Sequence, residues 1–130
     1  MNPISGNVMI GTAGELLVQL RLLQHGVQAA APIKDSGNDL ISVKETVFRA
    51  IQVKTTTRAR YSVHGLPAFY HILAVVHLCV RDSEFHLDQS CIYLIPRQKV
   101  EGASRRIDDL GCFRLTHDLI HQLFQAENER

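Results

Sequence analysis

The sequence has no tryptophan, few aromatic residues and almost no imbalance of charge. Its 130 residues include 6% aromatic residues, and 14 lysines and arginines face 13 acidic residues, for a net charge of +1 and a pI near 7.8. A charge this small produces no overall field that would attract a polyanion. Any contact with nucleic acid would therefore have to come from local basic patches.

Paired cysteines, histidine clusters and long apolar runs are also missing. Cys79, Cys91 and Cys112 are odd in number, widely spaced and set among apolar residues, which predicts buried thiols in a reducing cytoplasm rather than a disulfide framework or a zinc site. The seven histidines show no pair at a metal-ligand spacing on one helix, so none is assigned a role. With no secretory leader pattern and no apolar stretch of membrane-spanning length, we expect neither secretion nor membrane insertion.

Residues that can build a core are plentiful. The hydrophobic content of 45% is enough for one domain over residues 1–130. Apolar residues at helical spacing predict a first helix over Ala13–His25, and Thr12 with Glu15 fits a capping box at its start. A second helix is predicted over Thr116–Gln125, with Thr116 as its N-cap.

Several segments are typical of strands. The runs His71–Val80 and Ser90–Ile95 are almost continuously apolar, as expected for inner strands that are buried on both faces. Val27–Ala31 is a further possible strand, and Phe85–Leu87 can pair with its neighbours. We therefore predict an α/β fold with a central mixed sheet of about four or five strands flanked by helices.

The stretch Asn38–Lys54 is the most informative part of the chain. Two strands are predicted to meet at the polar turn Lys44–Thr46, and alternation along the second places Gln52 and Lys54 on one face. Asp39 opens the first strand, so antiparallel pairing brings its carboxylate towards them. Asp35 is the rival acid, but it lies among turn-forming residues. Three polar groups are thus expected to converge.

These residues resemble the motifs of the PD-(D/E)xK nuclease superfamily. The similar segments are Gly11-Thr-Ala-Gly-Glu15, Gly37-Asn-Asp-Leu-Ile41 and Ile51-Gln-Val-Lys-Thr55, and the later Ile92-Tyr-Leu-Ile-Pro96 looks like the distal strand of some bacterial and homing-endonuclease branches. Asn38 stands where the name-giving proline would be, and Gln52 replaces an acidic residue. A Gln-x-Lys version occurs in active branches. The resemblance implies a restriction-endonuclease-like αβββαβ core.

The resemblance also implies a chemistry. It assigns catalytic roles to Glu15, Asp39, Gln52 and Lys54, and it implies Mg²⁺, for which Mn²⁺ would substitute, held by Asp39, the Gln52 amide, the Val53 carbonyl and Glu15. The expected protein is a Mg²⁺-dependent endodeoxyribonuclease, a homodimer or higher oligomer, that contacts DNA phosphates through Arg58, Arg60, Arg97 and Arg105. Two alternatives remain open: a nuclease-fold domain that binds nucleic acid without cleaving it, and an interaction module in which Asp39 and Lys54 merely form an ion pair.

Overall fold

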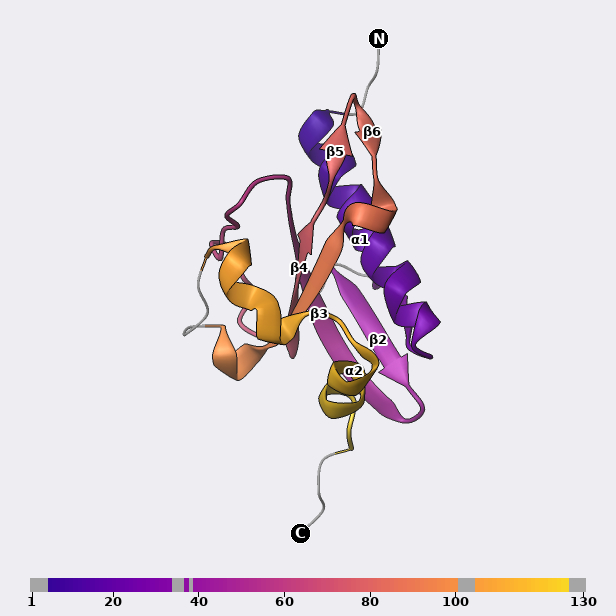
Figure 1. The fold of residues 1–130 in the computed structure, drawn as a ribbon. Coiled ribbons are helices and arrows are strands. Elements are labelled where there is room, and N and C mark those ends of the chain that lie inside the picture. Colours follow the sequence, from indigo (N-terminus) through magenta and orange to yellow (C-terminus); the bar gives the residue numbers. More distant parts are fainter. Residues whose placement is uncertain (1–4, 34–36, 38, 101–104, 127–130) are drawn as a thin grey trace.

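A five-stranded mixed sheet forms the centre of the molecule (Figure 1). A computed structural model describes residues 5–33, 37, 39–100 and 105–126. The sheet order is β1 (Gln28–Ala30), β2 (Leu40–Lys44), β3 (Val47–Thr56), β4 (Ile72–His77) and β7 (Cys91–Pro96). β3 and β4 run parallel, and the other neighbouring pairs are antiparallel. The predicted α/β class with a mixed sheet is confirmed.

The hairpin formed by β2 and β3 follows the sequence prediction. Its last pair is Lys44 with Val47, so Glu45 and Thr46 form the turn, and Glu45 adopts a left-handed φ of 58°. A two-residue turn of this kind suits the twist of an antiparallel pair. At the other end of the hairpin Leu40 lies opposite Ile51. This register decides which side chains of the two strands face one another.

The first helix begins earlier than predicted. α1 spans Gly6–Gln24, and the Ser5 hydroxyl caps it by accepting a hydrogen bond from the Val8 N–H at 3.2 Å. The capping box predicted for Thr12 and Glu15 is therefore wrong, because the backbone donors in the middle of a helix are already bonded within it. Glu15 lies at the middle of a continuous helix and is not needed at its start.

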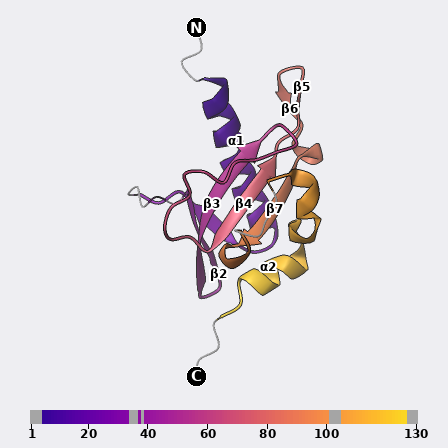
Figure 2. The same ribbon diagram turned by 90° about the vertical axis from the view of Figure 1, so that its left-hand side faces the viewer.

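Each face of the sheet carries its own apolar cluster. Leu17, Val18 and Leu22 of α1 pack on one face, together with Ile51 and Val53 of β3. Gly14 packs so closely on Thr55 that a Cβ at this glycine would overlap the threonine side chain. α1 can therefore approach β3 closely at this point. Figure 2 shows β3, β4 and β7 side by side with α1 behind them.

The opposite face is covered without a long helix. Leu73, Val75, Tyr93 and Ile95 of the sheet meet residues from the segment 61–70, Val100 just after the short 3-10 helix η2 (Arg97–Lys99), and residues of the 3-10 helix η3 (Ile107–Phe113). The parallel connection from β3 to β4 is made by the irregular segment 57–71, in the place where the αβββαβ pattern has a helix. The segment 57–71 leaves polar backbone on this face, close to the residues singled out by sequence.

The predicted run His71–Val80 is divided in the structure. β4 ends at His77, and the chain then forms a small hairpin of β5 (Val80–Arg81) and β6 (Glu84–Phe85), followed by the 3-10 helix η1 (Leu87–Gln89). Asp82 and Ser83 turn this hairpin with φ values of 53° and 64°. The five β4 residues from Ile72 to Val76 are buried, as predicted.

The second helix, α2 (His117–Leu123), begins as predicted. The Thr116 hydroxyl accepts a hydrogen bond from the Leu119 N–H at 3.1 Å, and Ile120 is fully buried. Arg49 of β3 holds the far end of α2, donating to the carbonyl oxygens of Leu123 and Gln125 at 2.9 and 2.8 Å. Such charged donors satisfy carbonyl groups that the end of a helix leaves unpaired.

The cysteines are free but not buried. Cys79 and Cys91 are partly exposed and Cys112 is exposed. The expectation of buried thiols is therefore wrong, since Cys79 and Cys91 lie at or just beyond strand ends and Cys112 lies on η3. Within the described ranges, no helix is both long and apolar enough to cross a membrane.

Candidate functional site

Asp39 lies where the hairpin opens, beside the middle of β3. Its Oδ2 accepts a hydrogen bond from the Val53 N–H at 2.8 Å. Continuing the β2–β3 register by one residue beyond Leu40 and Ile51 places Asp39 opposite Gln52. The N–H and C=O of a strand residue point to the same edge, so the Val53 carbonyl also faces the side from which Asp39 approaches. Two oxygen donors thus come from the hairpin itself. Asp35, the rival acid, and Asn38 lie outside the described residues.

Gln52 adds a third oxygen. Its side chain is nine-tenths buried, and its Oε1 is among the buried polar atoms that have no hydrogen-bond partner in the described part of the chain. A buried acceptor without a donor costs about 1–3 kcal/mol. A cation would satisfy this oxygen, which makes the amide suitable as a neutral ligand beside the Asp39 carboxylate.

Glu15 approaches Asp39 from α1. Burial raises the pKa of the Glu15 carboxyl above its ordinary value, and the negative charge of Asp39 raises this pKa further. Glu15 therefore lies close enough to Asp39 for the two carboxylates to repel each other. Two acidic groups held in this way favour a bound cation, because a cation offsets both the repulsion and the loss of water.

Lys54 lies two residues beyond Gln52 on β3, so both side chains share one face. Its Nζ donates a hydrogen bond to the backbone oxygen of His64 at 2.8 Å. His64 belongs to the segment 57–71, and Pro67 of the same segment lies beside Gly37, just before Asp39. This segment therefore forms one wall of the site. No sequence pattern marked His64, because its contribution is a backbone carbonyl that any residue would supply.

The ion pair of the third alternative is not formed. Asp39 bonds to the Val53 N–H, Lys54 bonds to His64, and no salt bridge joins Asp39 to Lys54, both of which the structure describes. The interaction-module alternative thus loses the contact on which it rested. The Lys54 ammonium is instead held at the side of the site by a neutral acceptor, which leaves its charge uncompensated by a carboxylate.

The donor set fits a hard divalent cation. Two carboxylates, an amide oxygen and a backbone carbonyl are all oxygen donors, the class that Mg²⁺ and Mn²⁺ prefer. Among the described residues no group of three or more histidine, cysteine, aspartate or glutamate side chains could hold a metal. A site here would consequently depend on the neutral oxygens of Gln52 and Val53 as well as on Asp39 and Glu15.

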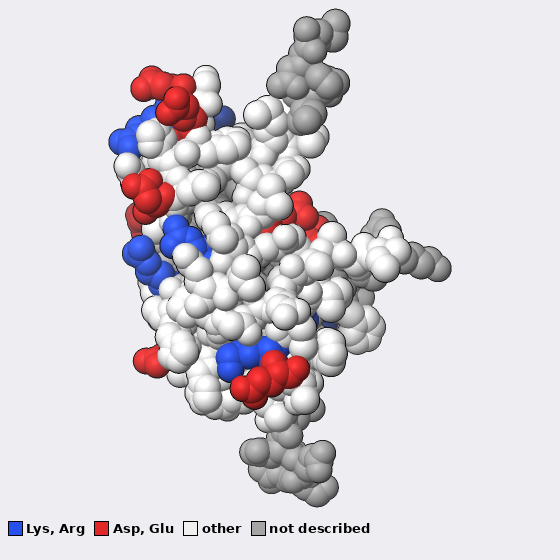
Figure 3. Space-filling model, turned by 90° about the vertical axis from the view of Figure 1, so that its right-hand side faces the viewer, with Lys and Arg blue, Asp and Glu red and all other residues white. Residues whose placement is uncertain are grey.

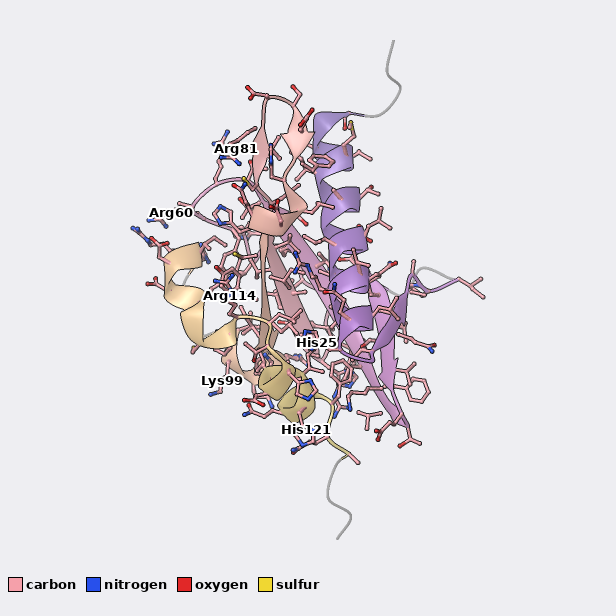
Figure 4. All side chains as sticks on the ribbon, turned by 45° about the vertical axis from the view of Figure 1, so that its right-hand side comes forward. His25, Arg60, Arg81, Lys99, Arg114 and His121 are labelled. Carbon is pink, nitrogen blue, oxygen red and sulfur yellow. The ribbon has the colours of Figure 1, made fainter. Side chains whose placement is uncertain are left out.

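Two basic segments that are distant in sequence lie side by side. Arg60 and Arg106 form an antiparallel bridge, the Tyr61 N–H donates to the Arg105 carbonyl, and the Ile107 N–H donates to the Ala59 carbonyl, both at 2.9 Å. The basic residues around Arg58 and around Arg105, which lie more than forty positions apart in the sequence, are therefore neighbours in the fold. Figure 4 shows Arg60, Arg114 and Lys99 on the side of the molecule away from α1.

Arg97 is placed differently. Its guanidinium lies 5.9 Å from the centre of the Phe69 ring and 5.6 Å from that of Tyr70. Arg97 and Arg105 line a cleft of about 760 Å³ whose other walls include Val63, Leu66 and Pro67. The cleft lies along the segment 57–71, which also holds Lys54 through the His64 carbonyl. Arg97, Arg105 and Lys54 therefore belong to one side of the fold.

The histidines contain a pair that sequence inspection overlooked. His117 and His121 lie one turn apart on α2, and the ring of His25 lies 5.9 Å from that of His117. The spacing His-x-x-x-His, which places two histidines on one face of a helix, could have identified this pair in the sequence. Figure 4 places His25 and His121 near the end of the molecule that carries α2. These rings do not form a metal-binding group in the part of the chain that the structure describes.

Comparisons with known proteins support the fold. The chain is similar to a solved structure described as a bacterial homing endonuclease, I-Ssp6803I, with a TM-score of 0.63 and 16% sequence identity over 92% of this chain and 94% of the other. No protein-family model matches the chain, and no curated protein matches it significantly. At this identity the likeness establishes a shared nuclease-like fold over nearly the whole length of both chains.

Proposed function

We propose that this protein is a Mg²⁺-dependent endodeoxyribonuclease of PD-(D/E)xK type, with Gln52 in the place of the second acidic residue. The supporting observation is the arrangement around the hairpin: Asp39 is tied to the Val53 N–H, lies opposite the unpaired Gln52 amide oxygen, and interacts with Glu15. The nuclease-like fold agrees with this activity. The proposal rests on the site itself, because a fold alone does not determine a function.

Four groups would hold Mg²⁺ or Mn²⁺: the Asp39 and Glu15 carboxylates, the Gln52 amide oxygen and the Val53 carbonyl. When bound, the cation supplies charge that stabilises the extra negative charge of a phosphoryl group under attack. Asp39 has the central role, since its Oδ2 is already oriented by the Val53 N–H at 2.8 Å. Its second oxygen can then face the cation.

Lys54 contributes a separate positive charge. Its Nζ can donate three hydrogen bonds, and the His64 carbonyl takes one of them. The remaining protons can be donated to a phosphate oxygen or to an attacking water. The anchor at His64 restricts the rotation of a long side chain before DNA binds, which reduces the entropy lost in reaching the transition state.

The competing proposal is a nuclease-fold domain that binds DNA without cleaving it, for which Gln52 is the supporting feature. A neutral amide is a weaker ligand than a carboxylate, so metal affinity would be lower than in a site with a second acid. Binding without cleavage distinguishes this alternative from the enzyme. Lys54 favours the enzyme, because binding alone does not require a half-buried lysine that is anchored on the same strand as Gln52.

A digestion panel tests the proposed function. Supercoiled plasmid, a four-way junction and a single strand should be incubated with Mg²⁺, with Mn²⁺ and with EDTA. We expect cleavage of at least one substrate with either metal and none with EDTA. Binding to any of these DNAs without cleavage under both metals would support the non-cleaving alternative.

Glu15 should lower the stability of the metal-free protein near neutral pH. The pKa of Glu15 is higher in the folded protein than its ordinary value of 4.5, so the folded state binds the proton more tightly than the unfolded state does. The free energy of unfolding therefore falls as the pH rises from 4.5 through the pKa of the folded state, and the loss is complete above that pKa. We therefore expect Glu15→Gln to raise the melting temperature in EDTA at pH 7 and to have little effect at pH 4. Thermal unfolding between pH 4 and pH 7 measures this difference in melting temperature, and Glu84→Gln, at an exposed position, is the control. Equal melting temperatures at pH 7 would contradict the prediction.

Arg58 and Arg60 should contact DNA phosphates. The backbone of this turn is held by the Thr56 hydroxyl, which donates to the Arg60 carbonyl and accepts from the Arg58 N–H, so replacing the two side chains spares the turn. Each lost phosphate contact lowers the log-log salt slope by about 0.9, so the double Arg→Gln variant should lose about 1.8. Fluorescence anisotropy against salt measures this. Lys44→Gln, on the hairpin, should leave the slope unchanged, and an unchanged slope in the double variant would make the segment an ordinary surface loop.

A further inference from the structure

The outer face of α1 is apolar although α1 already buries its inner face. Leu16, Leu20 and Leu23 are 58%, 51% and 59% exposed, and Val8 is similarly exposed. A surface helix normally directs polar residues outward, and one that is apolar all round is normally covered on both sides. α1 carries only two charged residues, Glu15 and Arg21. Its outer face is therefore a surface without a partner in this fold.

The surroundings of α1 enlarge this surface. Phe85 of β6 and Leu87 of η1 are also exposed, and the Arg21 guanidinium fixes η1 beside α1 by donating to the Leu87 carbonyl at 3.0 Å. Figure 3 shows that most of this side is uncharged, with a few acidic and basic residues set within it and around it. Monomeric proteins rarely expose contiguous apolar patches larger than a few hundred Å², and such patches mark interaction sites.

Leu16 and Leu20 form a ridge between two grooves. One groove, of about 370 Å³, lies between this ridge and the residues Phe85 and Leu87. The other, of about 390 Å³, lies between the same ridge and Gln28 and Ala29 of β1. A twofold interface requires one patch to carry both a projection and a matching hollow, and helices pack by placing ridges in grooves. The α1 surface meets both requirements.

We infer that the occupant of the α1 surface is a second copy of this chain, packed by twofold symmetry with the Leu16–Leu20 ridge of each copy in a groove of the other. α1 carries one acidic and one basic residue, Glu15 and Arg21, so the surface has no excess of charge of one sign that would make two copies repel each other. The basic side that bears Arg60, Arg114 and Lys99 lies away from α1 (Figure 4). A dimer formed in this way leaves that side of both copies accessible.

Analytical ultracentrifugation of the full chain tests this inference. The wild type should sediment as a dimer at micromolar concentrations, and the double variant Leu16→Glu, Leu20→Glu should dimerise at least about a hundredfold more weakly, because it opposes like charges in an apolar interface. Both leucines are about half exposed, so the variant should keep the circular dichroism spectrum of the wild type. Phe48→Glu, at a 63% exposed position outside the surface, is the matched control and should remain dimeric.

A charge exchange tests the contact itself. The double glutamate variant (Leu16→Glu with Leu20→Glu) and the double lysine variant (Leu16→Lys with Leu20→Lys) should each be monomeric. An equimolar mixture of the two should form a heterodimer, since opposite charges then meet across the interface between the two α1 surfaces. This result also excludes a different protein as the occupant. A monomeric wild type at its highest soluble concentration, a dimeric glutamate variant, or a mixture that stays monomeric would overturn the inference.

Discussion

Asp39→Ala is expected to abolish both divalent-metal binding and DNA cleavage. Asp39 supplies the charged oxygen nearest to the Gln52 amide and the Val53 carbonyl, and these two neighbours are neutral. Without Asp39, Glu15 on α1 would be the one charged ligand of the proposed set, beside two neutral oxygens. Isothermal titration with Mg²⁺ and a nicking assay on the same preparations measure the two losses.

Alanine at this position also removes the acceptor of the Val53 N–H, which costs about 1–3 kcal/mol of stability. Asp39→Asn separates the two effects, since an amide oxygen can accept the same hydrogen bond without the negative charge. We expect the asparagine variant to melt near the wild-type temperature and still to bind no metal. The exposed Glu84→Gln is the control for removal of an acidic side chain. Should the wild type bind Mg²⁺ no better than Asp39→Asn, the metal site assigned to these residues would be abandoned.

Lys54→Ala is expected to lower the cleavage rate by about a thousandfold, equivalent to about 4 kcal/mol of transition-state stabilisation. Metal affinity should be retained, because lysine offers no ligand to a cation, and DNA affinity should change little. The loss should therefore appear in kcat and not in KM, as for an interaction made chiefly in the transition state. Single-turnover cleavage with saturating Mg²⁺ gives the rate of the chemical step.

Two further variants separate the loss of the Lys54 ammonium from the loss of side-chain bulk and from the loss of a lysine elsewhere. Lys54→Met keeps most of the length and the apolar bulk of the side chain while removing its charge and its donor, so it should be as inactive as the alanine variant. Lys44→Met removes a lysine from β2 whose side chain is 22% exposed, and it should cleave normally. A rate within tenfold of the wild type in both Lys54 variants would assign this lysine a structural role only.

Gln52→Glu would decide how much the neutral amide limits the site. A carboxylate at this position restores a charged ligand, so metal affinity should rise. Its effect on rate depends on Lys54, since a new carboxylate two residues away on the same face can bind the ammonium in the ground state. Reading metal affinity and single-turnover rate together separates these two consequences.

Sequence alone was sufficient for the β2–β3 hairpin and for the placement of Asp39 beside the Gln52–Val53 part of β3. Alternation along a strand and the short turn at Glu45 are local properties, and together they set the register that places Asp39 opposite Gln52. The strands β4 and β7 were equally predictable, because both are apolar runs, but β7 is an edge strand and not the inner strand predicted for Ser90–Ile95. The start of α1 was not, since Gly6 and Gly11 weaken the local helical signal while the Ser5 cap and core packing favour the helix.

Other features of the site required the folded chain. The approach of Glu15 to Asp39, the bond from Lys54 to the His64 carbonyl and the pairing of residues 59–61 with 105–107 all join elements that are distant in sequence. The exposed ridge at Leu16 and Leu20 belongs to the same class, because a pattern of leucines on a helix does not state which of them the core will cover. Local backbone geometry can be read along a chain, whereas contacts between distant elements depend on how the elements pack, and packing depends on all of them at once.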